Sequence, residues 1–201
     1  MRRLSLAALL LAAISCRSAT PIDVGVTFAN TWRVAGDPLT TPEQARIKDV
    51  ALATLHAAFE EFDVRFGEPR KGERTIRVED TPYGRMMNFG AAGMTYPASI
   101  VSFVRFDILA NTVLATAQCA HIDGCRSTTR AELVDGLGRG IGATAAHELG
   151  HQAGLGFSHD ARCDDCYDGD ASTSYAHFFA AKHWSGAALA QMQRTLPGRR
   201  P

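Results

Sequence analysis

The sequence predicts a single α/β domain, in which a twisted mixed sheet lies under two long helices and a small C-terminal subdomain follows. Of the 201 residues, 46% are hydrophobic and 21% are charged, which is the composition of a soluble globular protein. Strand-like alternation is followed by helical spacing, further strands and a second helix. The 21 basic and 21 acidic residues cancel, so no basic face favours nucleic acid as a partner.

Residues 1–15 are typical of an export signal, since a basic start precedes an apolar run too short to span a bilayer. The Ala-Ile-Ser-Cys that ends at Cys16 resembles the bacterial lipobox, whose cysteine is lipidated. We therefore expect an extracytoplasmic, exported protein whose one domain spans residues 16–201 and which meets the membrane only through a lipid on Cys16. Plain secretion, with cleavage by Thr20, is the alternative.

The first half of the chain begins with a strand and a helix. Residues 22–28 alternate apolar and small or polar side chains, as a half-buried strand does. Thr41 is predicted to cap the helix, with Pro42 at its first position and Gln44 as the capping-box partner. An apolar face then continues at helical spacing to near Asp63. Its members are Ile47, Val50, Ala51, Leu55, Ala58, Phe59 and Phe62.

Further strands are predicted at residues 75–79 and 100–106, where apolar and β-branched side chains dominate. Residues 83–97 are rich in Gly and Met and predict a weaker strand with turns, in which the methionines fill the core. Residues 111–129 are expected to be irregular.

A second helix is predicted from Thr129, because an apolar row recurs every four residues. The row is Leu133, Leu137, Ile141, Ala145 and Leu149. Glycines at 136, 138, 140 and 142 each cost such a helix about 1 kcal/mol relative to Ala. No strand leads into them as a nucleotide-binding loop requires, so we interpret them as sites of close approach between helix and sheet.

The end of this helix carries the chemistry, in the HExxH sequence of residues 147–151. His147 and His151 lie four residues apart, so both imidazoles are on one helical face and can reach one zinc ion. Glu148 is placed to take a proton from a water at that metal without being a ligand itself. Gly154 is expected to end the helix in a left-handed turn that sends the chain back toward the metal.

This stretch resembles the metzincin metalloproteases, whose pattern is HExxHxxGxxH. The positions that match are His147, Glu148, His151 and Gly154. Where the pattern has its third histidine this chain has Phe157, and His159 follows two residues later, so the resemblance implies His159 as the third zinc ligand. The adjacent Asp160, or an aspartate after it, is the alternative ligand. No Glu follows Glu148, which excludes a glutamate ligand from a later helix. The implied fold is zincin-like.

The family also has a methionine turn beneath its metal. Residues 171–175 resemble that turn with Thr173 in place of methionine, and the resemblance then implies that Tyr175 approaches the metal or steadies the oxyanion. An ordinary packed Tyr175 is the alternative. His177 and His183 are interpreted as satisfied surface or helix histidines. A terminal helical run is expected at residues 187–196.

Four cysteines remain beyond Cys16. In an oxidising compartment their spacing favours two local disulfides, Cys119 with Cys125 and Cys163 with Cys166. Crossed pairing, or a zinc site of four thiolates, is the alternative.

The predicted function is zinc-dependent hydrolysis of peptide bonds by an exported endopeptidase acting on a peptide or protein substrate. An edge strand near residues 94–97 is expected to align the substrate by strand addition. Two alternatives stay open. One is a non-catalytic zincin-fold lipoprotein that binds a peptide or protein partner, and the other is a hydrolase of cell-wall peptide or amide bonds.

Overall fold

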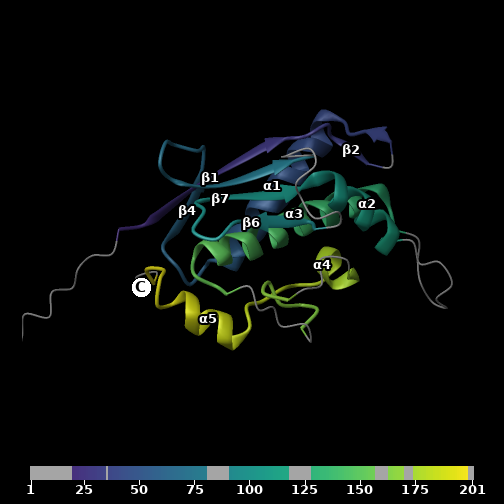
Figure 1. Ribbon diagram of the computed structural model, residues 1–201. Coiled ribbons are helices and arrows are strands. Elements are labelled where there is room, and N and C mark those ends of the chain that lie inside the picture. The colour runs from purple at the N-terminus through teal and green to yellow at the C-terminus, as the bar shows by residue number, and fades with distance from the viewer. Residues whose placement is uncertain are drawn as a thin grey trace, which may run out of the picture.

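The computed structural model describes residues 20–34, 36–80, 91–117, 128–156, 163–169 and 174–198 (Figure 1). The strands are β1 (Ile22–Ala29), β2 (Arg33–Val34), β3 (Asp37–Pro38), β4 (Val64–Gly67), β5 (Arg74–Glu79), β6 (Gly93–Thr95) and β7 (Val101–Arg105). The helices are α1 (Thr41–Ala58), α2 (Phe106–Ala117), α3 (Arg130–Gln152), α4 (Tyr175–Phe179) and α5 (Gly186–Met192). The predicted signal segment, Cys16, and the pair Cys119 and Cys125 lie outside the described residues.

A five-stranded sheet in the order β4-β1-β5-β7-β6 forms the framework. Its first four strands are parallel, and β6 runs antiparallel to β7 at the edge. The predicted fold class is therefore confirmed: a mixed, mostly parallel sheet with two long helices and a smaller C-terminal part (Figure 1). The parallel strands have buried apolar runs, as strands covered by helices do.

Helix α1 and its cap both lie one residue earlier than predicted. Thr40, not Thr41, accepts the hydrogen bond from the Glu43 amide, and the Glu43 carboxylate accepts from the Thr40 amide. Arg130 also donates to that carboxylate, which favours this register, while Gln44 donates its side-chain amide to the Leu39 carbonyl. The helix ends at Ala58, before the predicted Asp63, and the buried Phe59 and Phe62 belong to the turn after it.

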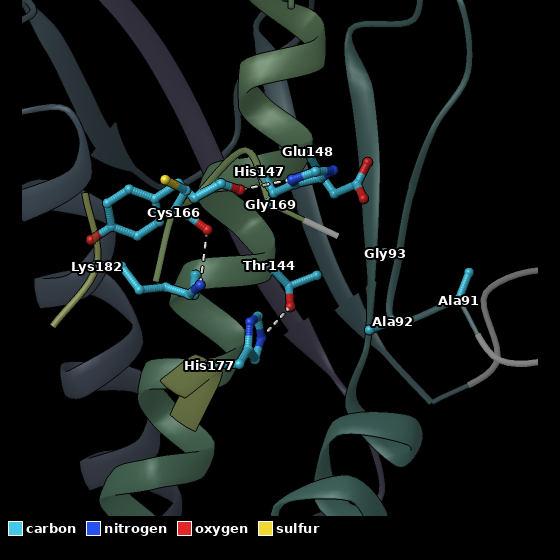
Figure 2. Close-up of a pocket in the computed structure, with 12 residues that line it drawn as sticks. Ala91, Ala92, Gly93, Thr144, His147, Glu148, Cys166, Gly169, His177 and Lys182 are labelled. Atoms are coloured by element: carbon cyan, nitrogen blue, oxygen red, sulfur yellow. Dashed lines mark hydrogen bonds between the residues drawn. The ribbon is translucent and has the colours of Figure 1, made fainter. Parts of the chain in front are cut away.

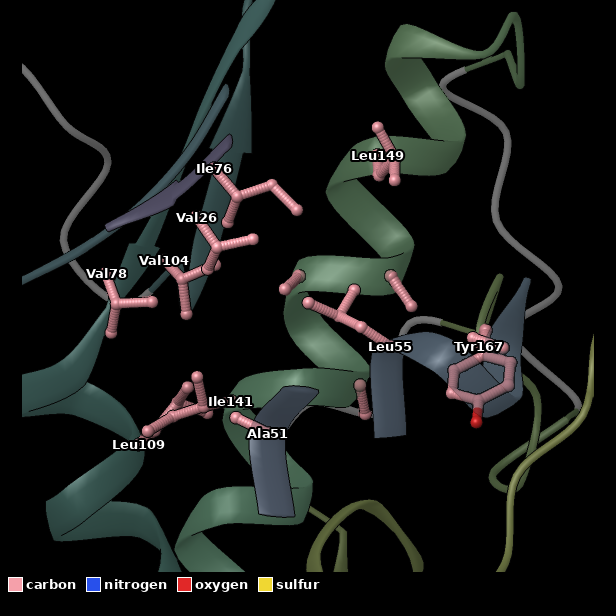
Figure 3. Close-up of a cluster of buried hydrophobic side chains, with 14 of the residues drawn as sticks. Val26, Ala51, Leu55, Ile76, Val78, Val104, Leu109, Ile141, Leu149 and Tyr167 are labelled. Atoms are coloured by element: carbon pink, nitrogen blue, oxygen red, sulfur yellow. The ribbon is translucent and has the colours of Figure 1, made fainter. Parts of the chain in front are cut away.

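Helix α3 is the centre of the core, because it packs against α1 and also against β5, β6 and β7. Figure 3 shows side chains of the sheet facing this helix, with α1 beyond it. Most of the predicted apolar row is buried: Leu137, Ile141, Ala145 and Leu149, with Leu133 partly buried. The helix starts within one residue of the predicted Thr129, which is its cap and pairs reciprocally with Glu132.

The glycines of α3 do mark close approaches, but to helices and not to the sheet as predicted. A Cβ on Gly138 would lie 2.7 Å from Val50 Cβ, and one on Gly142 would lie 2.6 Å from the Ala51 carbonyl oxygen, both in α1. A Cβ on Gly140 would lie 2.4 Å from the ring of Phe178 in α4. Because these glycines have no side chains, α3 can pack closely against both α1 and α4.

The prediction of an irregular segment from residue 111 was wrong, because α2 covers Phe106–Ala117. Phe106, which was predicted to end a strand, is the first helical residue. The buried positions recur at three and four residues, as on one helical face: Phe106, Leu109, Ala110, Val113 and Ala117. This face packs against α3 and β5.

The C-terminal part is joined to the rest of the domain by buried side chains, such as Phe178 and Met192, and by hydrogen bonds. The Trp184 indole donates to the Ala58 carbonyl at 2.6 Å, and the Asp63 amide donates to the Pro197 carbonyl at 2.8 Å. Helix α5 occupies a shorter range than the predicted 187–196. Among the described helices, none combines the length and the apolar character that crossing a bilayer requires.

Candidate metal centre and its cavity

The last turns of α3 carry the three HExxH side chains. His147 and His151 are one turn apart and partly buried, and their rings meet edge to face with centroids 4.7 Å apart. The His147 Nδ1 lies 2.7 Å from the Tyr167 carbonyl oxygen, and the His151 Nδ1 lies 3.4 Å from that of Leu155. Because a carbonyl only accepts, each ring donates from Nδ1 and presents Nε2 as the lone-pair nitrogen.

The two Nε2 atoms face each other at 3.1 Å. In a tetrahedral zinc site with Zn–N bonds of 2.0–2.1 Å, two imidazole nitrogens are about 3.3 Å apart. Both the donor type and the spacing therefore fit a zinc ion, and the backbone carbonyls hold both rings in the required tautomer.

The helix ends as the sequence predicts, at a glycine in the left-handed region. Gly154 has φ +98°, its amide donates to the His151 carbonyl, and the Leu155 amide donates to the Gly150 carbonyl. This Schellman arrangement turns the chain back, and so places the Leu155 carbonyl beside the His151 ring. A substitution with a Cβ at Gly154 would strain the turn that orients this ligand.

Glu148 is buried, with 5% of its surface exposed. Burial raises the pKa of its carboxyl group to about 7, and the hydrogen bond from Thr95 opposes that rise. A cation bound nearby would lower the pKa again.

A chain of polar side chains, which begins at Gln152 of α3 and continues through Ser102 and Thr95 of the sheet, reaches Glu148. The Gln152 amide donates to Ser102 Oγ at 2.6 Å, Ser102 and Thr95 hydroxyls are 2.6 Å apart, and the Thr95 hydroxyl donates to Glu148 Oε2 at 2.6 Å. All the donors can point in one direction, toward the carboxylate, so each bond polarises the next. Gly93 leaves room for that carboxylate, since a Cβ there would lie 2.4 Å from Glu148 Oε1.

Sequence reasoning missed this chain of hydrogen bonds. A signal was present, because Ser102 is a polar residue inside the apolar strand and is fully buried, with 0% exposure. A buried hydroxyl needs partners, but the sequence does not show that Thr95 pairs opposite it across β6 and β7.

A cavity of about 160 Å³ lies against these groups. His147, Glu148 and Thr144 of α3 line it together with Gly93 of β6, and His177 and Lys182 line it from the C-terminal part (Figure 2). His177 is satisfied, as predicted, but it is buried in α4 and not on the surface. Its Nε2 bonds with Thr144 Oγ1 and the Gly140 carbonyl, both at 3.0 Å, and burial lowers its pKa to about 3.

Of the remaining predicted site residues, the structure describes Tyr175 alone. His159, Asp160 and Thr173 lie outside the described residues. Tyr175 begins α4 with 60% of its surface exposed and stacks on Phe179 at 4.7 Å between centroids. It is not among the described residues that line the cavity, so its local environment is that of a packed surface tyrosine.

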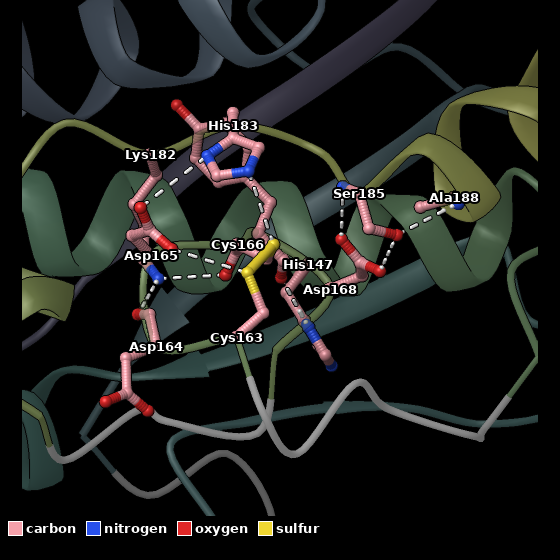
Figure 4. Close-up of a disulfide and its surroundings, with 11 residues drawn as sticks. His147, Cys163, Asp164, Asp165, Cys166, Asp168, Lys182, His183, Ser185 and Ala188 are labelled. Carbon is pink, nitrogen blue, oxygen red and sulfur yellow. Dashed lines mark hydrogen bonds and ion pairs between the residues drawn. A yellow bond between two sulfur atoms is a disulfide. The ribbon is translucent and has the colours of Figure 1, made fainter.

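Next to the cavity, Cys163 and Cys166 form a disulfide, as predicted (Figure 4). Asp165 and His183 lie beside it, and the potential ligand atoms of the four residues are within 4.8 Å of one another. Sulfurs joined in a disulfide are not thiolates, however, and the thiolate is the form that binds zinc. With the disulfide formed, the histidine pair on α3 is the better candidate for the metal.

No protein-family model matches the sequence, and no curated protein matches it. Among solved structures, the fold is similar to that of archaemetzincin from Methanopyrus kandleri, with a TM-score of 0.49 and 15% sequence identity. The similarity covers 90% of this chain and 98% of that chain. The interpretation of the site rests on the residues of this chain and their geometry.

Proposed function

We propose that the protein is an exported zinc-dependent endopeptidase. The observation that carries the proposal is the pair of Nε2 atoms of His147 and His151, 3.1 Å apart, with Glu148 on the adjoining cavity wall. His159 would be the third ligand, with Asp160 as the alternative, and both lie outside the described residues. Bound zinc would supply a Lewis acid that acidifies water and polarises the scissile carbonyl.

The chain's own residues supply the proton transfers. The Glu148 carboxylate accepts a proton from the attacking water and returns it to the amine that leaves as the peptide bond breaks. Thr95 holds this carboxylate by a hydrogen bond of 2.6 Å, so the base does not have to be ordered during the reaction.

The edge of the sheet offers a place for an extended substrate. β6 pairs with β7 along one side, and it is the last strand in the order of the described sheet. Gly93 of this strand lines the cavity beside Glu148. A peptide added along the other side of β6 would bring its backbone past the zinc site, which suits cleavage within a chain.

Export and membrane attachment are part of the proposal and rest on the sequence. Residues 1–15 would direct the chain out of the cytoplasm, and a lipid on Cys16 would hold the domain at a membrane surface. Fractionation of cells that express the full chain tests this. Loss of membrane association in Cys16→Ser supports the lipid anchor, and unchanged association contradicts it.

The test of catalysis compares Glu148→Gln with the wild type and with Glu61→Gln, an exposed control on the same chain. We expect about one zinc per chain in all three proteins, and a rate of peptide cleavage about 10²- to 10⁴-fold lower in Glu148→Gln alone. Equal rates for Glu148→Gln and the wild type would reject the mechanism. Bound zinc without cleavage of any peptide in a mixed library would favour the alternative, a non-catalytic lipoprotein that binds a peptide or protein partner.

A further inference from the structure

Lys182 provides the cavity with a positive charge that the proposed mechanism does not use. It follows α4 and lines the same cavity as His147 and Glu148. Its ammonium group donates to two backbone carbonyls, that of Asp164 at 3.0 Å and that of Cys166 at 2.9 Å (Figure 4). These two bonds fix the position of the charge in the cavity wall.

No carboxylate of the described residues lies within ion-pair distance of this ammonium. Asp168 accepts instead from the amide and hydroxyl of Ser185, and the carboxylate of Asp165 lies 3.9 Å from His183. Burial lowers the pKa of Lys182, against the more distant attraction of the aspartates. An ammonium has three N–H donors, and the two carbonyls use two of them.

A second cavity continues from the first and has more basic than acidic groups in its described lining. The two share Ala143, Tyr167, His177 and Lys182, and the second has a volume of about 560 Å³. Arg139 lines it with a half-buried guanidinium whose Nε donates to the Phe178 carbonyl. Arg46 also lines the second cavity, but its guanidinium is paired at 2.7 Å with Asp135, which is not a lining residue. Among the described lining residues, Asp49 is the one acidic group.

We propose that Lys182 forms a subsite for a carboxylate of the substrate. This inference rests on the proposed peptidase function and names its substrate class: peptides with a carboxylate next to the scissile bond. In Figure 2, Lys182 and Gly93 of β6 are on opposite sides of the α3 residues that line the cavity. A substrate strand laid along β6 projects alternate side chains away from the sheet plane, and one of them points across the cavity toward the ammonium.

A carboxylate has two sources in a peptide, an acidic side chain and the free end of the chain. Three peptides that differ only at this point distinguish them. In the first peptide, the residue after the scissile bond is Gln and the C-terminus is amidated. The second has Glu at that position and an amidated C-terminus. The third has Gln at that position and a free C-terminal carboxylate. The measured quantity is the ratio of kcat/KM for each carboxylate peptide to that for the neutral peptide.

For the zinc-loaded wild type we expect a ratio of at least about 10, equivalent to about 1.4 kcal/mol, for one of the two carboxylate peptides. Lys182→Met should reduce this ratio toward one, and Lys182→Arg should keep part of it. Lys71→Met, a control at an exposed turn, should keep all of it. A wild-type ratio near one, or an unchanged ratio in Lys182→Met, overturns the subsite.

Binding separates this inference from the proposed function. Calorimetry with Glu148→Gln, with and without zinc, gives Kd values for the same three peptides in the absence of turnover. If the wild type cleaves no peptide but the carboxylate peptide still binds tighter in a Lys182-dependent way, the subsite stands and the peptidase proposal fails. If all three peptides are cleaved with equal kcat/KM and bound with equal Kd, the peptidase proposal stands and the subsite is rejected.

Discussion

The two walls of the cavity are built in different ways. One wall consists of α3 and the edge strands, where the residues around Glu148 are buried and linked by the Thr95, Ser102 and Gln152 hydrogen bonds. The other wall comes from residues 163–169 and 174–184, which contain one short helix and a disulfide. Long packed elements form the first wall, whereas the second is a short segment held by a few buried side chains, such as Phe178, and by individual polar bonds, such as those of Lys182 and His177.

This difference assigns different tasks to the two walls. The helix and the sheet hold the candidate ligands and the candidate base through buried packing, with hydrogen bonds such as that from Thr95 to Glu148 added to it. The C-terminal wall orients His147 through the Tyr167 carbonyl and presents the Lys182 charge. Substitutions in the first wall should therefore lower stability or the rate of the chemical step, and those in the second should change which ligands bind.

The largest effect is expected from Gly142→Ala in the packed wall. The added Cβ would lie 2.5 Å from Thr54 Cβ and 2.6 Å from the Ala51 carbonyl oxygen, so the backbones of α1 and α3 must separate. We expect the free energy of unfolding to fall by about 1–3 kcal/mol in chemical denaturation. Gly186→Ala is the control, because nothing lies within 4 Å of its Cβ, and equal losses in both variants would contradict the close packing.

A smaller effect is expected from Thr95→Val, which removes the hydroxyl and keeps the shape. Loss of a hydrogen bond to the catalytic carboxylate should lower kcat about tenfold, with little change in KM or zinc content. Thr95→Ser retains the hydroxyl and should recover most of the activity. Steady-state kinetics on one neutral peptide measure this, and equal impairment of the Ser and Val variants would show that the threonine acts only by packing.

The smallest effect concerns His177, which joins the two walls. Its folded-state pKa of about 3 lies below its ordinary value of 6.5, so the unfolded chain takes up a proton first as the pH falls. The stability that neutral His177 contributes is thus present above pH 6.5 and is lost progressively toward pH 3. Between pH 7 and pH 5.5 the loss from this residue is about 1 kcal/mol.

The measurement is the free energy of unfolding at pH 7 and pH 5.5 for the wild type, His177→Gln and the exposed control His183→Gln. His177→Gln should have a flatter pH dependence by about 1 kcal/mol over that range, and His183→Gln should match the wild type. Identical pH dependence in all three proteins would show that His177 does not connect the walls in its neutral form.

Local signals in the sequence were sufficient for the long helix and the main strands of the first wall, but not for the hydrogen bonds around Glu148. An apolar row located α3 within one residue of its start, and strand-like patterns located β1, β5 and β7. Helix α2 was missed because Arg105 precedes it in place of a capping side chain, and because its apolar residues follow a strand without a break. The short strand β4 was not predicted, since four residues show little periodicity.

The second wall depends on contacts between distant residues, which a single sequence does not display. Spacing predicted the Cys163–Cys166 disulfide and the turn at Gly154, because both are local. It did not predict that Tyr167 offers its carbonyl to His147, or that Lys182 lines the cavity. The roles of His159 and Tyr175 stay predictions.

The central claim is tested most directly by the ligands of bound zinc. X-ray absorption at the zinc edge, on the full chain loaded with one equivalent of metal, reports which atoms are in the first coordination sphere. The account predicts nitrogen and oxygen ligands near 2.0–2.1 Å in the wild type, and loss of stoichiometric zinc in His147→Ala and in His151→Ala. Sulfur ligands near 2.3 Å, or full zinc retention in both variants, would place the metal elsewhere and contradict it.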